Sequence, residues 1–245
     1  MTDPSITLMP NNLFLTMALR QIHPEQLESL QVIAADQQQL ATHPQRRMEQ
    51  LISRSWRRQI LAAQLHQTPD NLCFVKDAYG KPYLMHYPAL QFSQSHCTEQ
   101  FVLAFNQQGI ALGVDIEAKR RVINQARLAR RILTASEMQV FTHTKDPQAY
   151  LLKCWTIKEA VLKACGLGIR LNLNTLETEN KNSLFNRIEN TDTAIKNRDI
   201  QHGVSTAYHA AIGEWAYLCF ETAGYYCTVA WQNHLYHPVS VNWLP

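Results

Sequence analysis

Glycine is scarce in this chain of 245 residues, which contains only 8. None of these glycines forms the GxGxxG or GxxxxGK[ST] pattern, so a Rossmann dinucleotide site and a P-loop are both excluded at the level of motifs. Apolar runs are also short, far below the roughly 20 residues that a membrane-spanning helix needs. The opening segment, MTDPSITLMPNN, lacks the basic-then-apolar order of a signal peptide. We therefore expect a cytoplasmic protein without a membrane-spanning segment.

Cysteines in metal-binding or redox spacing are missing as well. The six cysteines show no CxxC pair and no metal-ligand spacing with histidine. Several lie in apolar stretches, where a free thiol packs as a small hydrophobic group. We expect all six to be reduced, and no zinc or iron–sulfur site.

Charge of either sign is low, and its distribution is uneven. Hydrophobic residues make up 46% and charged residues 18%, a balance typical of folded domains. The net charge of +3 is too small to indicate nucleic-acid binding. Between Lys119 and Arg131, however, stand six basic residues and no acidic one. Such a run is usually a solvated helix face, and it can also steer an acidic macromolecule.

The first half of the chain predicts one sheet and one long helix. A helical region is expected from 24 to 65, where apolar residues recur at steps of three and four. Short apolar segments predict strands around it, at 13–20, 83–87, 89–95, 101–105 and 110–117.

The second half repeats this outline. Asp146 as N-cap and Pro147 at the first helical position predict a helix that runs to Cys165 and stops at Gly166. A strand is expected at 169–177, a polar surface excursion at 180–205, and a closing hairpin from 215–220 and 225–231. The fold class predicted is α+β, with two pseudo-symmetric lobes, each a small antiparallel sheet packed on a long helix. The lobes predicted are residues 1–112 and 113–245.

Two acidic residues stand together in GVDIE, residues 113–117. Strand alternation places Asp115 and Glu117 on one face and Val114 and Ile116 on the other. Neighbouring carboxylates repel each other unless a cation or a donor compensates them. A solvated strand face has the same pattern, but the apolar run before it indicates a partly buried strand, where paired carboxylates more often serve a function.

The helix around WTIKEAVLK carries a second candidate pair. Glu159 and Lys163 lie one turn apart on the same face, whereas Trp155 falls on a more apolar one. The spacing alone favours a surface ion pair. The alternative makes Glu159 a third carboxylate for a metal and Lys163 a phosphate ligand, and oxygen ligands without Cys or His suit Mg²⁺.

Taken in order, these elements resemble the Sfp-type 4′-phosphopantetheinyl transferase family, part of the holo-acyl-carrier-protein synthase superfamily. The resemblance is carried by GVDIE, then ILTASE, then WTIKEAVLK, and extends upstream to YGKPYL at 79–84 and FSQSH at 92–96. It covers roughly residues 48–177. The acidic pair followed by WxxKEAxxK is its most specific feature.

The resemblance implies a reaction, a cofactor and a set of site residues. Such enzymes move the phosphopantetheine arm of coenzyme A to a serine of an apo carrier protein and release adenosine 3′,5′-bisphosphate. By resemblance, Mg²⁺ would be held by Asp115, Glu117 and Glu159, and Lys163 would neutralise phosphate charge. Catalysis would rest on Glu159, Lys163 and Asp115. Contacts to the coenzyme A phosphates and nucleotide would come from Arg46, Arg47, Lys81, Ser95, His96 and Lys163.

Two elements depart from the family pattern or fit another role. In the family's NxSHSG element, this chain has Ser93, Cys97 and Thr98 in place of Asn, Ser and Gly, and it retains Ser95 and His96. Glu137 matches an acidic residue of the family near the metal or coenzyme. Because Thr134 to Glu137 also has the sequence of a capping box, we favour the capping role for Glu137.

The resemblance also implies partners. Carrier proteins of this kind are acidic, so Arg120, Arg121 and Arg127 of the basic run are candidates to dock them. The chain length predicts a monomer with the site between two lobes. Two other functions stay open: a Mg²⁺-dependent phosphohydrolase of nucleotide diphosphates, and a binding module for coenzyme A or a carrier that has lost turnover. Neither nucleic acid nor membrane is expected as a partner.

Overall fold

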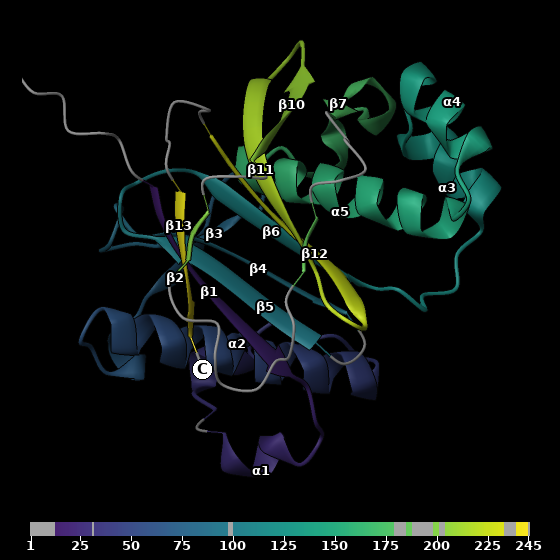
Figure 1. The fold of residues 1–245 in the computed structure, drawn as a ribbon. Coiled ribbons are helices and arrows are strands. Elements are labelled where there is room, and N and C mark those ends of the chain that lie inside the picture. Colours follow the sequence, from purple (N-terminus) through teal and green to yellow (C-terminus); the bar gives the residue numbers. More distant parts are fainter. Residues whose placement is uncertain are drawn as a thin grey trace, which may run out of the picture.

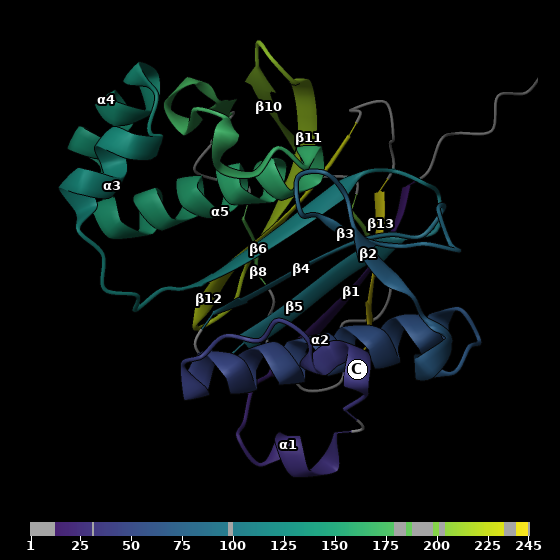
Figure 2. The same ribbon diagram turned by 180° about the vertical axis from the view of Figure 1, so that it is seen from behind.

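The computed structural model of the chain describes residues 13–30, 32–97, 100–178, 185–187, 198–200, 204–232 and 239–244. Two sheets lie between two long helices, α2 (Pro44–Gln64) and α5 (Pro147–Cys165), which cover opposite sides of the molecule (Figures 1 and 2). The α+β fold class predicted from the sequence is confirmed. No helix in the described ranges is long and apolar enough to cross a membrane.

The first sheet packs its outer face on α2. Its strand order is β4 (Gln91–Cys97), β5 (Gln100–Asn106), β1 (Leu13–Gln21), β13 (Val239–Leu244) and β9 (Arg198–Ile200). Buried side chains from the helix and from the sheet share one core, among them Ile52, Trp56, Leu61, Phe101 and Leu103. The pairing of β1 with β13 is parallel and brings the far end of the chain into this sheet.

The second sheet packs its outer face on α5. Its order is β6 (Leu112–Ala118), β12 (Tyr225–Gln232), β11 (Gly213–Glu221), β10 (Ser205–His209) and β7 (Glu177–Thr178), and β8 (Phe185–Arg187) pairs with β11 in parallel. The inner faces of the two sheets meet in a separate core, which includes Leu15, Met17, Val114, Leu218 and Trp231. The layers are therefore helix, sheet, sheet and helix.

The remaining elements are short. A β2 (Phe74–Lys76) and β3 (Pro82–Leu84) hairpin extends the first half, and α1 (Gln26–Ser29) precedes α2. Along the chain, α3 (Gln125–Ile132) and α4 (Ala135–His143) come between β6 and α5.

The sheets meet along a seam between β4 and β6. The backbone N–H of Val114 donates to Ser93 Oγ across this seam at 3.1 Å. Gly113 lets α5 lie directly on β6, because a Cβ at this position would stand 2.1 Å from the carbonyl oxygen of Ala160. Residues from β4, β6 and α5 therefore converge at one place.

Two predicted elements were wrong in extent or type. The helical region expected over 24–65 begins as a long helix only at Pro44, after α1 and a 3₁₀ turn. The strand expected over 169–177 is two 3₁₀ turns that lead to β7. In this segment, the Leu173 carbonyl accepts a hydrogen bond from the buried Lys158 ammonium. In a strand, a neighbouring strand would have to supply that hydrogen bond instead. Most of the excursion expected over 180–205 lies outside the described residues, as does Thr98.

Candidate functional site

A buried hydrogen-bond network joins β4, β6 and α5. The Lys163 ammonium donates to Asp115 Oδ1 at 2.7 Å, to Ser95 Oγ at 2.8 Å and to the Val114 carbonyl at 3.1 Å. Ser95 Oγ in turn donates to Asp115 Oδ1 at 2.8 Å. Asp115 is only 5% exposed, and its Oδ2 has no hydrogen-bond partner among the described residues. One oxygen of this carboxylate is thus saturated and the other is open.

Glu117, two residues further along β6, is held from another side. Its Oε1 accepts a hydrogen bond from Trp155 Nε1 at 2.8 Å and a close ion pair from Arg121. Burial and the negative charge of Asp115 raise the pKa of Glu117 to about 7, although Arg121 and Trp155 oppose the rise. The carboxylate therefore stands in a place where a negative charge is costly without a cation.

Glu159 faces the same region from α5. Burial and the charge of Asp115 raise the pKa of this carboxyl, while Lys163, Arg131 and Arg121 oppose the rise. Glu117 and Glu159 thus both experience the charge of Asp115, as neighbouring carboxylates do. Among the described residues, no three His, Cys, Asp or Glu side chains are grouped so that they could hold a metal ion as they lie.

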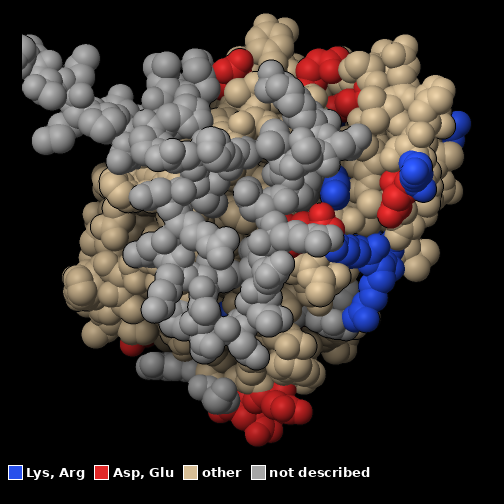
Figure 3. Space-filling view, viewed as in Figure 1, with Lys and Arg blue, Asp and Glu red and all other residues tan. Residues whose placement is uncertain are grey.

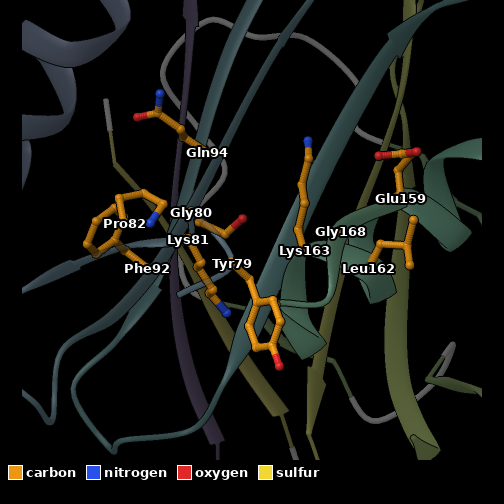
Figure 4. A pocket seen from close by; sticks show the side chains of 12 residues that line it. Tyr79, Gly80, Lys81, Pro82, Phe92, Gln94, Glu159, Leu162, Lys163 and Gly168 are labelled. Carbon is orange, nitrogen blue, oxygen red and sulfur yellow. The ribbon is translucent and has the colours of Figure 1, made fainter. Parts of the chain in front are cut away.

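A cavity of about 300 Å³ opens beside Glu159 and Lys163 (Figure 4). Both side chains rise from α5 in the same direction, and the other walls come from the β2–β3 turn, β4 and the end of α5. Lys81 lies across this cavity and points the opposite way. Its ammonium donates to the carbonyls of Ala164 and Leu112, at 2.9 and 3.2 Å, and burial lowers its pKa.

A second, more polar cavity of about 680 Å³ lies on the Glu117 side of the network. Its arginine, glutamate and histidine lining residues are Arg46, Glu49, His96, Glu117, Arg120 and Arg121. His96 Nε2 stands 3.8 Å from Glu49 Oε2, and burial lowers the pKa of this histidine. Arg47 is exposed on the same helix as Arg46 and is not among the residues that line this cavity.

The structure therefore divides the predicted site residues into three groups. Asp115, Ser95 and Lys163 are in direct contact. Arg46, His96 and Glu117 line the polar cavity, and Glu159, Lys163 and Lys81 line the other one. Arg47 lies in none of these three groups.

Two residues with a role at this site escaped the sequence analysis. Trp155 was placed on an apolar face, yet its indole N–H binds Glu117. Arg121 was considered only for docking a partner, yet it pairs with Glu117. The spacing of four residues between Glu117 and Arg121 is the one signal in the sequence that pointed to this pair.

Other residues of the basic run take different positions. Lys119 pairs with Glu221 at 2.7 Å, and Lys153 of α5 reaches the same carboxylate at 3.4 Å. On the face drawn in Figure 3, most basic side chains on the right stand beside acidic ones. The arginines that α3 and the preceding loop expose are Arg120, Arg121, Arg127, Arg130 and Arg131.

Glu137 has the capping role that the sequence favoured. Its Oε2 accepts from the backbone N–H of Thr134, and the Thr134 hydroxyl accepts from the backbone N–H of Glu137. The same carboxylate pairs with the fully buried Lys158. Glu137 thus fastens α4 to α5.

The part of the chain that carries Asp115, Glu117, Glu159 and Lys163 matches a known family. Residues 111–219 match the family model described as the 4′-phosphopantetheinyl transferase superfamily. This part of the chain is similar to that superfamily. The resemblance predicted from GVDIE and WTIKEAVLK is confirmed.

Individual relatives agree with the family model. The chain is 28% identical over 120 residues to 4′-phosphopantetheinyl transferase Sfp of Bacillus subtilis, an alignment that covers 48% of this chain and 52% of Sfp. It is 26% identical over 160 residues to 4′-phosphopantetheinyl transferase ffp of B. subtilis, over 63% of this chain and 70% of ffp. A crystal structure of Thermotoga maritima holo-[acyl-carrier-protein] synthase matches 51% of this chain and 65% of that one, at 18% identity and a TM-score of 0.35. The chain thus spans about half the length of Sfp.

Proposed function

We propose that this protein transfers the 4′-phosphopantetheine group of coenzyme A to a serine of an apo carrier protein, as a holo-acyl-carrier-protein synthase does. The observation that carries the proposal is the contact of Lys163 with the buried Asp115, beside Glu117 and Glu159, within the segment that matches the superfamily. A site that combines clustered carboxylates with an ammonium suits chemistry on a charged phosphate diester.

Mg²⁺ fits this donor set. Asp115 Oδ2 is buried without a partner, and the charge of Asp115 raises the pKa of both Glu117 and Glu159. A divalent cation would relieve this repulsion, and carboxylate oxygens are ligands that Mg²⁺ prefers. Asp115, Glu117 and Glu159 would hold the ion, and because the three carboxylates are not grouped as they lie, their side chains would have to turn towards one another to do so. When bound, it would neutralise and polarise the pyrophosphate of coenzyme A.

Lys163 organises the centre of the site. Its three N–H donors are all engaged, by Ser95, Val114 and Asp115. The ammonium therefore fixes the orientation of the Asp115 carboxylate. To contact a phosphate oxygen, Lys163 would exchange one of these three partners for it.

In this proposal, Glu159 accepts the proton of the attacking serine. Its raised pKa brings the carboxylate closer to the range in which a general base is effective near neutral pH. The proton would move from the serine hydroxyl to a Glu159 oxygen as the serine oxygen bonds to phosphorus. The bond that breaks joins this phosphorus to the bridging oxygen, and adenosine 3′,5′-bisphosphate leaves with that oxygen.

The nucleotide end of coenzyme A would occupy the polar cavity. Arg46 and His96 line it, and Ser95, which precedes His96, accepts a hydrogen bond from Lys163. Arg47 and Lys81 also remain candidates to contact coenzyme A. Their side chains would have to reorient when the coenzyme binds. An acidic carrier protein would approach over the exposed arginines Arg120 and Arg127. The cytoplasmic location, the monomeric state and the two-lobe division at 112/113 stay predictions of the sequence.

The decisive experiment is the intact mass of an apo acyl carrier protein after incubation with this protein, coenzyme A and Mg²⁺. We expect the mass of one phosphopantetheine to be gained by the wild type and a loss of at least a hundredfold in rate for Glu159→Gln, which keeps the size of the side chain. Omission of Mg²⁺ is the matched control.

Two other outcomes would contradict the proposal and favour a different function. Adenosine 3′,5′-bisphosphate released without a modified carrier would indicate the phosphohydrolase. Coenzyme A binding without any mass gain on several carriers would indicate the binding module.

A further inference from the structure

Arg121 holds a position between two different kinds of partner. Its guanidinium pairs with Glu117, the carboxylate proposed to hold Mg²⁺, and it also lines the polar cavity proposed for the coenzyme nucleotide. A cation at Glu117 would compete with this guanidinium. A phosphate in the cavity would compete with Glu117 for it.

The backbone beneath Arg121 is fixed, whereas its side chain is accessible. The N–H of Arg121 donates to the Ala118 carbonyl at 3.0 Å, and Gln148 Nε2 on α5 donates to the carbonyls of Lys119 and Arg121. The side chain is 43% exposed, and its guanidinium carbon lies 5.9 Å from the centre of the Trp155 ring. The guanidinium can therefore change partner by rotation of the side chain, without movement of the chain.

Glu117 does not depend on Arg121 alone. Trp155 Nε1 donates to the same Oε1, so the carboxylate keeps its orientation when the guanidinium leaves. In the polar cavity, the acidic lining residues are Glu49, which stands near His96, and Glu117 itself. A phosphate is thus the partner that an arginine released into this cavity would find.

We propose that Arg121 couples the binding of Mg²⁺ to the binding of coenzyme A. In the free protein it occupies Glu117, and it moves to the coenzyme phosphates when Mg²⁺ takes that carboxylate. Each ligand then removes a competitor of the other, so the coupling between them is reciprocal. This inference rests on the proposed function for the identity of the two ligands.

The test measures binding rather than turnover. Isothermal titration with Mg²⁺ alone compares the wild type with Arg121→Gln and with a control, Lys119→Gln. The control removes a positive charge nearby, but Lys119 pairs with Glu221 rather than with Glu117. We expect Arg121→Gln to bind Mg²⁺ about five- to tenfold more tightly, as the loss of a partly exposed, charge-assisted competitor predicts. Lys119→Gln should stay within about twofold of the wild type. Arg121→Met, which keeps the aliphatic stem over Trp155, should repeat the effect.

A second titration measures the coupling itself. The factor by which saturating Mg²⁺ tightens coenzyme A binding should fall in Arg121→Gln by a similar five- to tenfold. Unchanged or weaker Mg²⁺ binding in both Arg121 variants would overturn the proposal. So would an equal shift in Lys119→Gln, an unchanged coupling factor, or no Mg²⁺ binding by any variant without coenzyme.

Failure of this inference and failure of the proposed function give different results. A wild type that modifies no carrier but shows the Arg121-dependent coupling contradicts only the transferase activity. A wild type that modifies the carrier while its Arg121 variants bind both ligands normally contradicts only the coupling.

Discussion

Two lysines of α5 each pair with a carboxylate on another element, and the two pairs differ in how completely they are closed. Lys158 is fully buried and donates to Glu137 and to the carbonyls of Ile132 and Leu173. The Glu137 oxygens also accept from Thr134 and Thr178. Lys163 is 31% exposed, and its partner Asp115 keeps one buried oxygen without a donor. The closed pair joins helices, whereas the open pair can still take a ligand.

This contrast shows how a buried charge indicates function. Both pairs involve the WTIKEAVLK segment, so burial and pairing alone do not separate them. The separating property is the unsatisfied acceptor, because a buried carboxylate oxygen without a donor is costly unless something else binds it. The comparison can be tested by breaking each pair in turn.

The largest effect is expected from the closed pair. Lys158→Met leaves the buried Glu137 carboxylate without its ammonium partner, so we expect the free energy of unfolding to fall by about 3–5 kcal/mol. Urea denaturation measures this loss. Lys163→Met is the matched control. It also removes the ammonium partner of a buried carboxylate, Asp115, but because Lys163 is partly exposed the loss should be smaller, about 1–2 kcal/mol, together with loss of the proposed transfer activity. Equal losses in the two variants would contradict the distinction between the pairs.

A smaller effect is expected from the pH dependence of the open site. Because burial and Asp115 raise the pKa of Glu117 to about 7 from 4.5, the folded protein holds a proton between these values that the unfolded chain releases. Stability from this group is therefore complete below about 4.5 and is lost as the pH rises to about 7.

Glu117→Gln removes this dependence and sharpens the comparison. Without metal, the free energy of unfolding of the wild type should fall by about 1–3 kcal/mol more than that of the variant between pH 4.5 and 7. Urea denaturation at several pH values measures both curves. Parallel curves would show that the Glu117 carboxyl has an ordinary pKa.

The smallest effect on stability is expected at Ser95, which bridges Lys163 and Asp115. Ser95→Ala removes one donor from Asp115 Oδ1 but leaves the ion pair, so unfolding should change by about 1 kcal/mol or less. The transfer rate should fall about tenfold, because Asp115 loses part of its fixed orientation. The control is Ser93→Ala. Ser93 lies on the same strand as Ser95, and the substitution removes the acceptor of the Val114 N–H. A similar fall in rate there would show that the seam, rather than Ser95, matters.

Much of this molecule could be predicted from periodicity and motif. Helix α5 begins at Pro147 and ends at Gly166, which has a φ of 74°, as its capping residues indicated. The Thr134 capping box, the β11–β12 hairpin and the carboxylates of GVDIE were likewise legible, because each depends on neighbours in sequence.

What escaped prediction depends on contacts between distant segments. The 3₁₀ turns that follow α5 are held in part by the Lys158 ammonium, which donates to the Leu173 carbonyl from a distant part of the sequence. The Trp155 indole shares the helix with many apolar residues, and only the position of β6 reveals that its N–H binds Glu117. The open oxygen of Asp115 follows from the same long-range packing.

The parallel pairing of β1 with β13 has a consequence for biosynthesis. Leu13 and Val239 are register partners, so β1 gains its neighbour on this side only after all the segments between them have been synthesised. Until then β1 presents an unpaired edge, the kind of surface on which strands of other chains assemble. Loop closure over such a separation is also slow. Newly made chains would therefore be prone to aggregate through this edge until β13 has been synthesised and has paired with β1.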